Sequence, residues 1–91
     1  MMIKITEYDR QKTKLIEAGF KKTTIQGCKI WRKRMSQHIS YLCIDGGEYQ
    51  DRKMCCFEIA LNTGGGDWYT FKKFRTIDKF IESSNKSVFQ Y

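Results

Sequence analysis

Between residues 20 and 71, short segments rich in β-branched and aromatic residues alternate with clusters of turn-forming residues. Apolar or alternating segments of about four to eight residues, bounded by glycine and polar residues, are typical of strands. We expect strands at residues 20–25, 28–35, 38–44 and 54–61, with a shorter fifth candidate at 68–71. In the fourth segment, Cys55, Phe57, Ile59 and Leu61 share the expected buried face. The pattern predicts an antiparallel sheet of four to five strands.

Two helices are predicted to flank this sheet. Thr6 and Asp9 have the spacing of a capping box, and Gly19 suits a helix end, so the first helix is expected at residues 7–18. Thr76 is a suitable N-cap for a second helix at residues 76–84, with an apolar face formed by Ile77, Phe80 and Ile81. The expected fold is a single two-layer α+β domain over residues 1–91, in the order α-β-β-β-β-α, with both helices on one sheet face.

The length of 91 residues and the hydrophobic content of 41% fit one domain with a modest core. The apolar runs are far shorter than the ~18 residues needed to span a bilayer. The first ten residues, MMIKITEYDR, become polar too early for a signal peptide. We therefore expect a soluble, cytoplasmic protein that does not bind a membrane.

The cysteines and the single histidine do not form a recognisable metal motif. The four cysteines are Cys28, Cys43, Cys55 and Cys56, and their spacings lack the paired ligands, two to four residues apart, of typical zinc sites. In a cytoplasmic protein they are expected to be reduced thiols that pack as small hydrophobic residues. His38 has no nucleophile or orienting partner that the sequence reveals. We expect no metal, no cofactor and no catalytic residues.

A run of three glycines at residues 64–66 is the other motif that could suggest chemistry. Phosphate-binding loops place glycines between a strand and a helix, and the Walker type ends in lysine followed by serine or threonine. Here Asp67 and Trp68 follow the run, and a carboxylate would repel phosphate. The glycines are therefore interpreted as a flexible hairpin turn or a mobile loop.

Positive charge is concentrated in the first part of the chain. The formal net charge is +7, and residues 10–34 contain nine basic residues but only one acidic residue, Glu17. A second basic group consists of Lys72, Lys73, Arg75 and Lys79. Such a field favours polyanions or an acidic protein surface, although it also keeps a small protein soluble.

The segment CKIWRKRM, residues 28–35, combines this charge with an aromatic residue. Read as a strand, it places Cys28 and Ile30 toward the core and Trp31 on the open face between Lys29 and Lys33. Lysines neutralise phosphates, and an indole can stack on a base. In the alternative interpretation, Trp31 belongs to the core and the lysine side chains extend around it. The sequence leaves both interpretations open.

Residues 14–32 resemble the start of HicA-type mRNA interferase toxins. Leu15, Gly19 and Phe20 match the phrase that ends the first helix of that family, and Gly27 and Cys28 correspond loosely to its glycine-serine turn. Lys29 occupies the position of the family's catalytic histidine. The resemblance covers about a fifth of the chain, and it implies an architecture like that of double-stranded-RNA-binding domains without nuclease activity.

Of three candidate functions, an enzyme is the least favoured because the sequence reveals no catalytic residues, and the other two are binding functions. The first is binding of DNA or RNA, through Lys12, Lys14, Lys21, Lys22, Lys29, Trp31, Arg32, Lys33 and Arg34. The alternative is a small protein of the phage or mobile-element type that binds and inhibits or regulates a host protein. Its contacts with an acidic surface would come from Gly65, Trp68, Tyr69, Lys72 and Lys73. A monomer and a homodimer both remain open.

Overall fold

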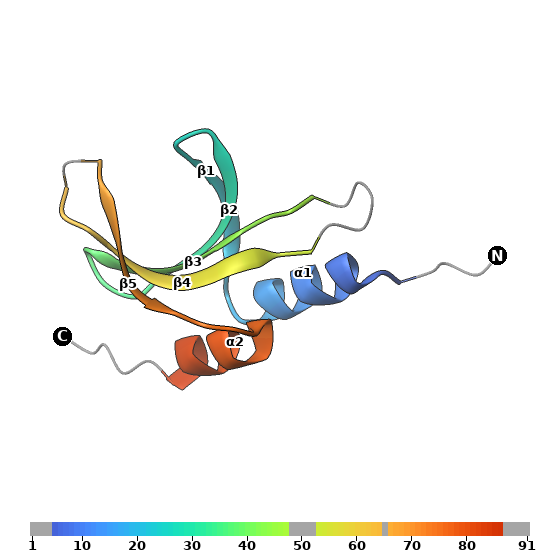
Figure 1. Ribbon diagram of the computed structural model, residues 1–91. Helices are drawn as coiled ribbons and strands as arrows, with labels where there is room; N and C mark the ends of the chain where they lie inside the picture. The colour runs from blue at the N-terminus through green and yellow to red at the C-terminus, as the bar shows by residue number, and fades with distance from the viewer. Residues whose placement is uncertain (1–4, 48–52, 65, 87–91) are drawn as a thin grey trace.

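The structure, a computed structural model, describes residues 5–47, 53–64 and 66–86, and its centre is a five-stranded antiparallel sheet. The strands follow one another across the sheet in chain order (Figure 1). They are β1 (Lys21–Ile25), β2 (Cys28–Arg34), β3 (Ile39–Ile44), β4 (Cys55–Asn62) and β5 (Trp68–Lys73). The predicted α+β fold is confirmed. The fifth candidate segment, predicted at residues 68–71, forms the strand β5.

Two helices, α1 (Glu7–Glu17) and α2 (Ile77–Lys86), form where the sequence predicts them, with ends that differ from the predicted ones by at most two residues. At the start of α1, the Asp9 backbone N–H donates to Thr6 Oγ1 at 3.1 Å, and the Thr6 N–H donates to the Asp9 carboxylate at 3.3 Å. Gly19, with φ of +94°, follows α1 in the left-handed conformation that glycine adopts most easily. The N–H of Lys79 donates to Thr76 Oγ1 at 3.3 Å and caps α2.

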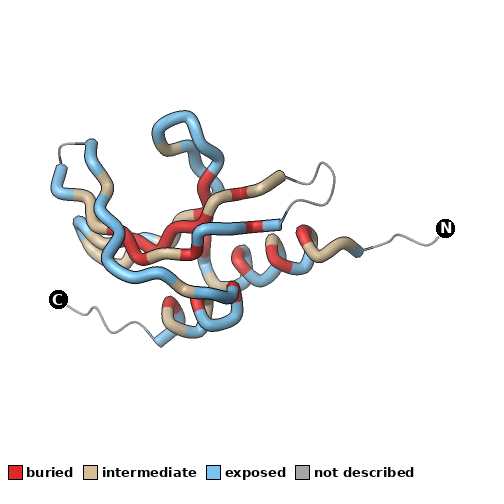
Figure 2. The backbone as a smooth tube through the Cα atoms, viewed as in Figure 1, coloured by how far each residue is buried: buried red, intermediate tan, exposed pale blue. Residues whose placement is uncertain are grey.

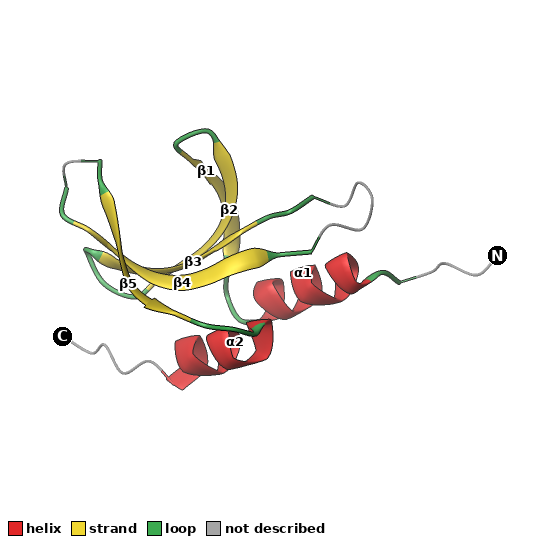
Figure 3. Cartoon of the chain, in the orientation of Figure 1, coloured by secondary structure: helices red, strands yellow, loops and turns green. Residues whose placement is uncertain are grey.

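Both helices cover the same face of the sheet, which we call the helix face (Figures 1 and 3). Phe80 of α2 is fully buried there, with its ring centroid 5.3 Å from that of Phe20 and 5.4 Å from that of Phe57. Tyr8 and Leu15 from α1 join the same core. Figure 2 shows that buried residues gather where helices and sheet meet. Each pair of packed rings stabilises the fold by about 0.5–1.5 kcal/mol beyond the effect of burying their apolar surface.

The opposite face, which we call the concave face, carries a second, smaller apolar cluster. Ile30, Leu42 and Ala60 are buried there although no helix covers them. The β1–β2 and β4–β5 hairpins bend away from the helices on either side of this face (Figure 1). Gln26 Nε2 in the first hairpin donates to the Gly66 carbonyl oxygen in the second at 3.2 Å. The curvature of the sheet therefore creates a second apolar interior.

Trp31 does not lie on the open face, so that interpretation of the 28–35 segment was wrong. It packs on the helix face with Tyr8 and Phe57 and is 4% exposed. Ile30 faces the concave side instead. Both faces of β2 bury an apolar residue, so the alternation of side chains alone could not show which face of the strand packs against the helices. The larger indole occupies the larger core, where its burial removes more apolar surface from water.

Cys55 was expected on the buried face of β4, and it is exposed. The cause is a bulge, because Cys56 adopts a positive φ of +55° and the register with β3 shifts between Leu42 and Ile44. A bulge inserts one residue and interrupts the alternation of side chains. Phe57 and Ile59, which follow the bulge, point into the core as predicted.

Residues 48–52, in the predicted loop after β3, lie outside the described residues, as does Gly65. Within the described part of the chain, neither helix is long and apolar enough to span a membrane. Cys43 is buried, as expected for a small hydrophobic residue, whereas Cys28, Cys55 and Cys56 are exposed.

Candidate nucleic-acid interface

Three cations lie next to one another on the concave face, and we call them the cationic cluster: Lys21, Arg32 and Arg34. Lys21 of β1 is directly opposite Arg32 of β2, and Arg34 is two residues further along the same strand. Arg32 pairs with Leu42 and Arg34 with Ser40, which fixes the face to which they belong. Like charges directly opposite each other destabilise a sheet, by up to about 1 kcal/mol. The pairing of Lys21 with Arg32 therefore does not help to stabilise the sheet.

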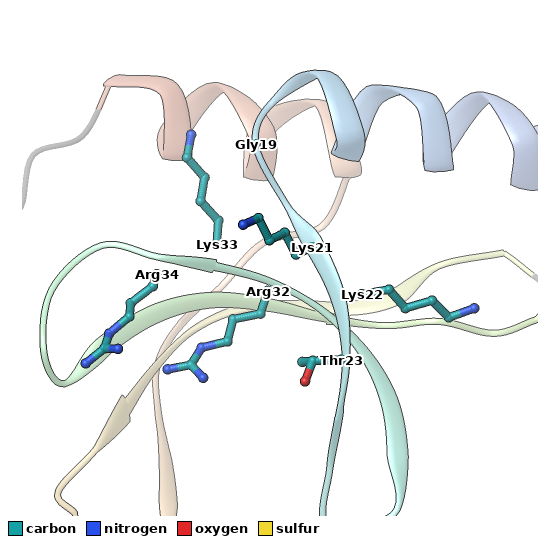
Figure 4. Close-up of a pocket in the computed structure, with 7 residues that line it drawn as sticks. All are labelled: Gly19, Lys21, Lys22, Thr23, Arg32, Lys33 and Arg34. Atoms are coloured by element: carbon teal, nitrogen blue, oxygen red, sulfur yellow. The ribbon is translucent and has the colours of Figure 1, made fainter.

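The cluster has no acidic counterpart in the described part of the chain. Among the residues that the structure describes, no carboxylate lies within ion-pairing distance of these three side chains. The three line an open hollow of about 580 Å³ along the exposed strand β1 (Figure 4). Their charge is therefore available to an anion from solution.

The two arginines are held in place by neutral groups. Arg32 Nε donates to Ser40 Oγ at 3.0 Å, and its guanidinium carbon lies 5.3 Å from the ring centroid of Trp68. Arg34 Nε donates to the Ser36 carbonyl oxygen at 3.2 Å. Each guanidinium has five N–H donors, so most remain for a ligand. Figure 4 shows both side chains extending from β2 in the same direction.

Two further lysines of the hollow are engaged elsewhere. Lys22 Nζ lies 3.1 Å from Asp45 Oδ2, and Lys33 Nζ donates to the Ser84 carbonyl oxygen of α2 at 3.2 Å. Burial lowers the pKa of Lys33 from its ordinary value. In Figure 4, Lys33 points toward the helices and Lys22 points away from the arginines. These lysines stabilise the fold and add charge to the hollow, but they do not face the same way as the cationic cluster.

Asp45 explains why Trp31 cannot stack on a base. The Asp45 Oδ2 atom accepts hydrogen bonds from Trp31 Nε1 at 3.1 Å and from the Tyr8 hydroxyl at 2.9 Å. The Gly47 N–H donates to Oδ1 at 2.7 Å. Burial opposes the charge of this carboxylate, but these bonds and the one from Lys22 outweigh burial and lower the pKa of Asp45 below its ordinary value. The indole is thus fixed inside the core.

The remaining predicted contacts lie away from the cationic cluster. Lys12 and Lys14 belong to α1, which covers the helix face, and Lys14 Nζ lies 2.9 Å from Asp78 Oδ1. Lys29 is exposed and pairs with Thr24, toward the turn between β1 and β2. The structure therefore brings together Lys21, Arg32 and Arg34 and separates them from these three lysines.

A second exposed surface is the strand β5, at the other edge of the sheet. Tyr69 is 55% exposed and Phe71 is 68% exposed. Lys72 and Lys73 are exposed on the same strand, and Lys72 Nζ lies 5.2 Å from the ring centroid of Phe74. Tyr69, Lys72 and Lys73 are contacts predicted for a protein partner. Trp68, another predicted contact, instead turns to the concave face and packs against its apolar cluster.

No arrangement for catalysis or metal binding emerges from the residues that the structure describes. His38 is exposed and its Nδ1 atom lies 2.8 Å from the Asn62 carbonyl oxygen. Burial raises the pKa of Cys43 to about 12, so its thiol stays protonated. Within the described ranges, no three potential metal ligands come together.

Comparison with protein-family models, curated proteins and solved structures yields no match to this chain. The candidate interface therefore depends on its own geometry. The sequence predicted these three cations only among nine candidate contacts, and it assigned the stacking role to Trp31. Trp68, the aromatic residue beside the cluster, follows a glycine-rich turn and was assigned to a protein partner. Only the curvature of the sheet brings it next to Arg32.

Proposed function

We propose that this protein binds nucleic acid through the concave face of its sheet, with Lys21, Arg32 and Arg34 contacting phosphates. The observation that supports this most is the cationic cluster itself. Lys21 and Arg32 are like charges directly opposite each other, and no described carboxylate pairs with either. A strand of phosphates would neutralise that repulsion and release its own counterions.

A solubilising surface would not need this arrangement. Charges that only keep a protein soluble are interspersed with the opposite sign, as on α2, where Lys86 Nζ lies 2.9 Å from Glu82 Oε1. The arginines of the cluster are instead positioned by hydrogen bonds to Ser40 and to the Ser36 backbone. Positioned guanidinium groups are well suited to recognise phosphate oxygens, because their planar N–H donors match the oxygen geometry.

The test compares two double variants with the same net charge. Lys21→Gln/Arg34→Gln removes two cations from the cluster, whereas Lys12→Gln/Lys79→Gln removes two from the helices. Fluorescence anisotropy with labelled DNA and RNA at about physiological salt should show weaker binding by the first pair only, by roughly tenfold or more. Equal affinity of the two variants would contradict the proposal, since only overall charge would then matter.

The exposed edge of β5 favours a second candidate function. Here the protein would be a small phage- or mobile-element-type regulator that binds an acidic surface of a host protein. Tyr69 and Phe71 are the large, exposed aromatic side chains of an edge strand, with Lys72 and Lys73 beside them. Aromatic residues are enriched among the residues that dominate protein–protein binding, and an edge strand can accept a further strand.

A pull-down at low salt tests this second function. The protein and its Tyr69→Ser/Phe71→Ser variant, both confirmed to be folded, would be compared as baits in a lysate of the native host. A partner retained by the unaltered protein and lost with the variant would support binding through β5. Identical recovery by both baits, or recovery of nucleic acid alone, would argue against it.

A further inference from the structure

The concave face also contains a small apolar pocket beside the cationic cluster. Its volume is about 180 Å³, and its lining includes four aliphatic side chains together with Trp68 and Glu58: Ile25, Ile30, Leu42 and Ile44. Pockets for drug-sized ligands are larger, about 300–1,000 Å³. The volume therefore suits a small ring system and is too small to enclose a drug-sized ligand.

Arg32 connects this pocket to the cationic cluster. The guanidinium of Arg32 lies 5.3 Å from the centroid of the Trp68 ring, and Trp68 lines the pocket. Arg32 itself lines the basic hollow. A ligand that spans both sites must have an anionic backbone and a flat, mostly apolar group attached to it. A nucleotide in a strand has both parts, one phosphate and one base.

We propose that the pocket accepts one unpaired base of a single-stranded nucleic acid, which stacks against Trp68 while the adjoining phosphates contact the cationic cluster. This inference rests on the proposed function and names its substrate class. A base inside a duplex is stacked and paired, so it cannot enter a pocket without first being extruded, at a cost of a few kcal/mol. The protein should therefore prefer single strands to duplexes.

Glu58 gives the pocket a chemical preference among bases. Its Oε2 atom accepts a hydrogen bond from the Thr70 hydroxyl at 3.0 Å, and a carboxylate has further acceptor positions. An acceptor next to an apolar wall suits a base with an exocyclic amino group, and a carboxylate accepts well from the cytosine amino group. Thymine and uracil present carbonyl oxygens there, which a carboxylate repels. We therefore expect cytosine to be favoured over thymine or uracil.

The first experiment uses the unaltered protein and three labelled probes of equal length: oligo-dC, oligo-dT and an abasic strand with the same phosphates. Binding is measured by fluorescence anisotropy at about physiological salt, alongside a blunt duplex. The proposal expects oligo-dC to bind most tightly, and the abasic strand and the duplex to bind most weakly. Equal affinity for the abasic strand and oligo-dC would overturn the base pocket and leave phosphate binding intact.

The second experiment compares Trp68→Leu with Tyr69→Leu, a matched control on the same strand. Tyr69 is exposed and pairs with Leu61, whereas Trp68 pairs with Asn62 and turns to the pocket. Trp68→Leu should weaken binding of oligo-dC roughly 5- to 150-fold, the range expected for one stacked base, and leave the weak duplex binding unchanged. Tyr69→Leu should have no effect. Equal losses in the two variants would overturn the proposal.

A third variant, Glu58→Gln, tests the pocket without removing an apolar side chain. Glutamine keeps one acceptor but adds an N–H donor, so it can bond to a thymine carbonyl oxygen. The preference for oligo-dC over oligo-dT should therefore shrink in this variant. An unchanged preference would show that Glu58 does not read the base. Failure of every probe to bind at physiological salt would instead overturn the proposed function itself.

Discussion

At the scale of single residues, Asp45 is a buried carboxylate on which three parts of the chain converge. Tyr8 comes from α1, Lys22 from β1 and Trp31 from β2, and the side chain of Asp45 is 1% exposed. A buried charge is stable only when it is paired and hydrogen-bonded, and removal of the acceptor leaves buried donors without partners. Asp45 therefore stabilises the junction between the first helix and the sheet.

Asp45→Asn should lower the free energy of unfolding by about 1–3 kcal/mol, because a neutral amide accepts more weakly and cannot pair with Lys22. Urea denaturation followed by tryptophan fluorescence measures this change. Asp67→Asn is the control, since Asp67 is an exposed carboxylate. If both variants unfold at the same urea concentration, Asp45 is not the stabilising centre that its contacts indicate.

The lowered pKa of Asp45 also predicts how stability depends on pH. Its pKa in the folded state lies below the unfolded value of about 3.9, so the carboxylate contributes stability above roughly pH 4. This contribution is lost as the pH falls through the folded pKa. Thermal melting between about pH 6 and pH 2 should show the loss in the unaltered protein. Asp45→Asn should lack this part of the acid sensitivity, and identical pH profiles would contradict the assignment.

At the scale of elements, the β1–β2 hairpin carries the cationic cluster, and its turn sets the register of those residues. Gln26 and Gly27 have φ angles of +52° and +80°, as in the type I′ turns that join two-residue hairpins. That turn places Lys21 opposite Arg32. A change in the turn therefore affects both the stability of the hairpin and the geometry of the proposed interface.

Gly27→Ala should destabilise the protein by about 1 kcal/mol, because an L-residue with a Cβ atom is strained at positive φ. Gly27→Asn should be milder, since asparagine adopts this conformation more readily. No atom lies within 4 Å of a Cβ built at this position, so backbone strain alone separates the two variants. Chemical denaturation measures both, and equal destabilisation would show that the φ angle is not the cause.

At the scale of the whole molecule, the fold separates structural cations from cations that face solvent. Lys14 pairs with Asp78 and Lys22 pairs with Asp45, while Lys33 donates to the backbone of α2. The cationic cluster, in contrast, lacks a carboxylate partner among the described residues. A net charge of +7 attracts polyanions from a distance, but only positioned charges release counterions at a defined site.

Salt dependence tests that separation. Three phosphate contacts with a single strand correspond to a slope of about −2 in log affinity against log salt concentration, or roughly a 20-fold loss between 50 and 200 mM salt. Lys21→Gln/Arg34→Gln should reduce the slope to about −0.7, whereas Lys12→Gln/Lys79→Gln should leave it near −2. The slopes come from anisotropy titrations at several salt concentrations. A slope that falls equally in both variants would mean that the overall positive charge attracts the nucleic acid and that the cationic cluster is not a specific site.

The sequence by itself determined the elements of this protein, because their signals are local. The Thr6–Asp9 cap and the apolar face of the last helix each involve neighbouring residues, and the structure confirms both. The concentration of cations near β2 could also be predicted from the sequence, because those residues lie close together along the chain.

Only the tertiary structure decided which face of β2 enters the main core and which aromatic residue lies beside the cations. Trp31 and Ile30 are neighbours on opposite faces, and local alternation is symmetric between them. The choice depends on Asp45, fourteen residues further along the chain, and on helices at both ends of the sequence. Trp68 reaches Arg32 because two hairpins bend toward each other, and curvature accumulates over the whole sheet.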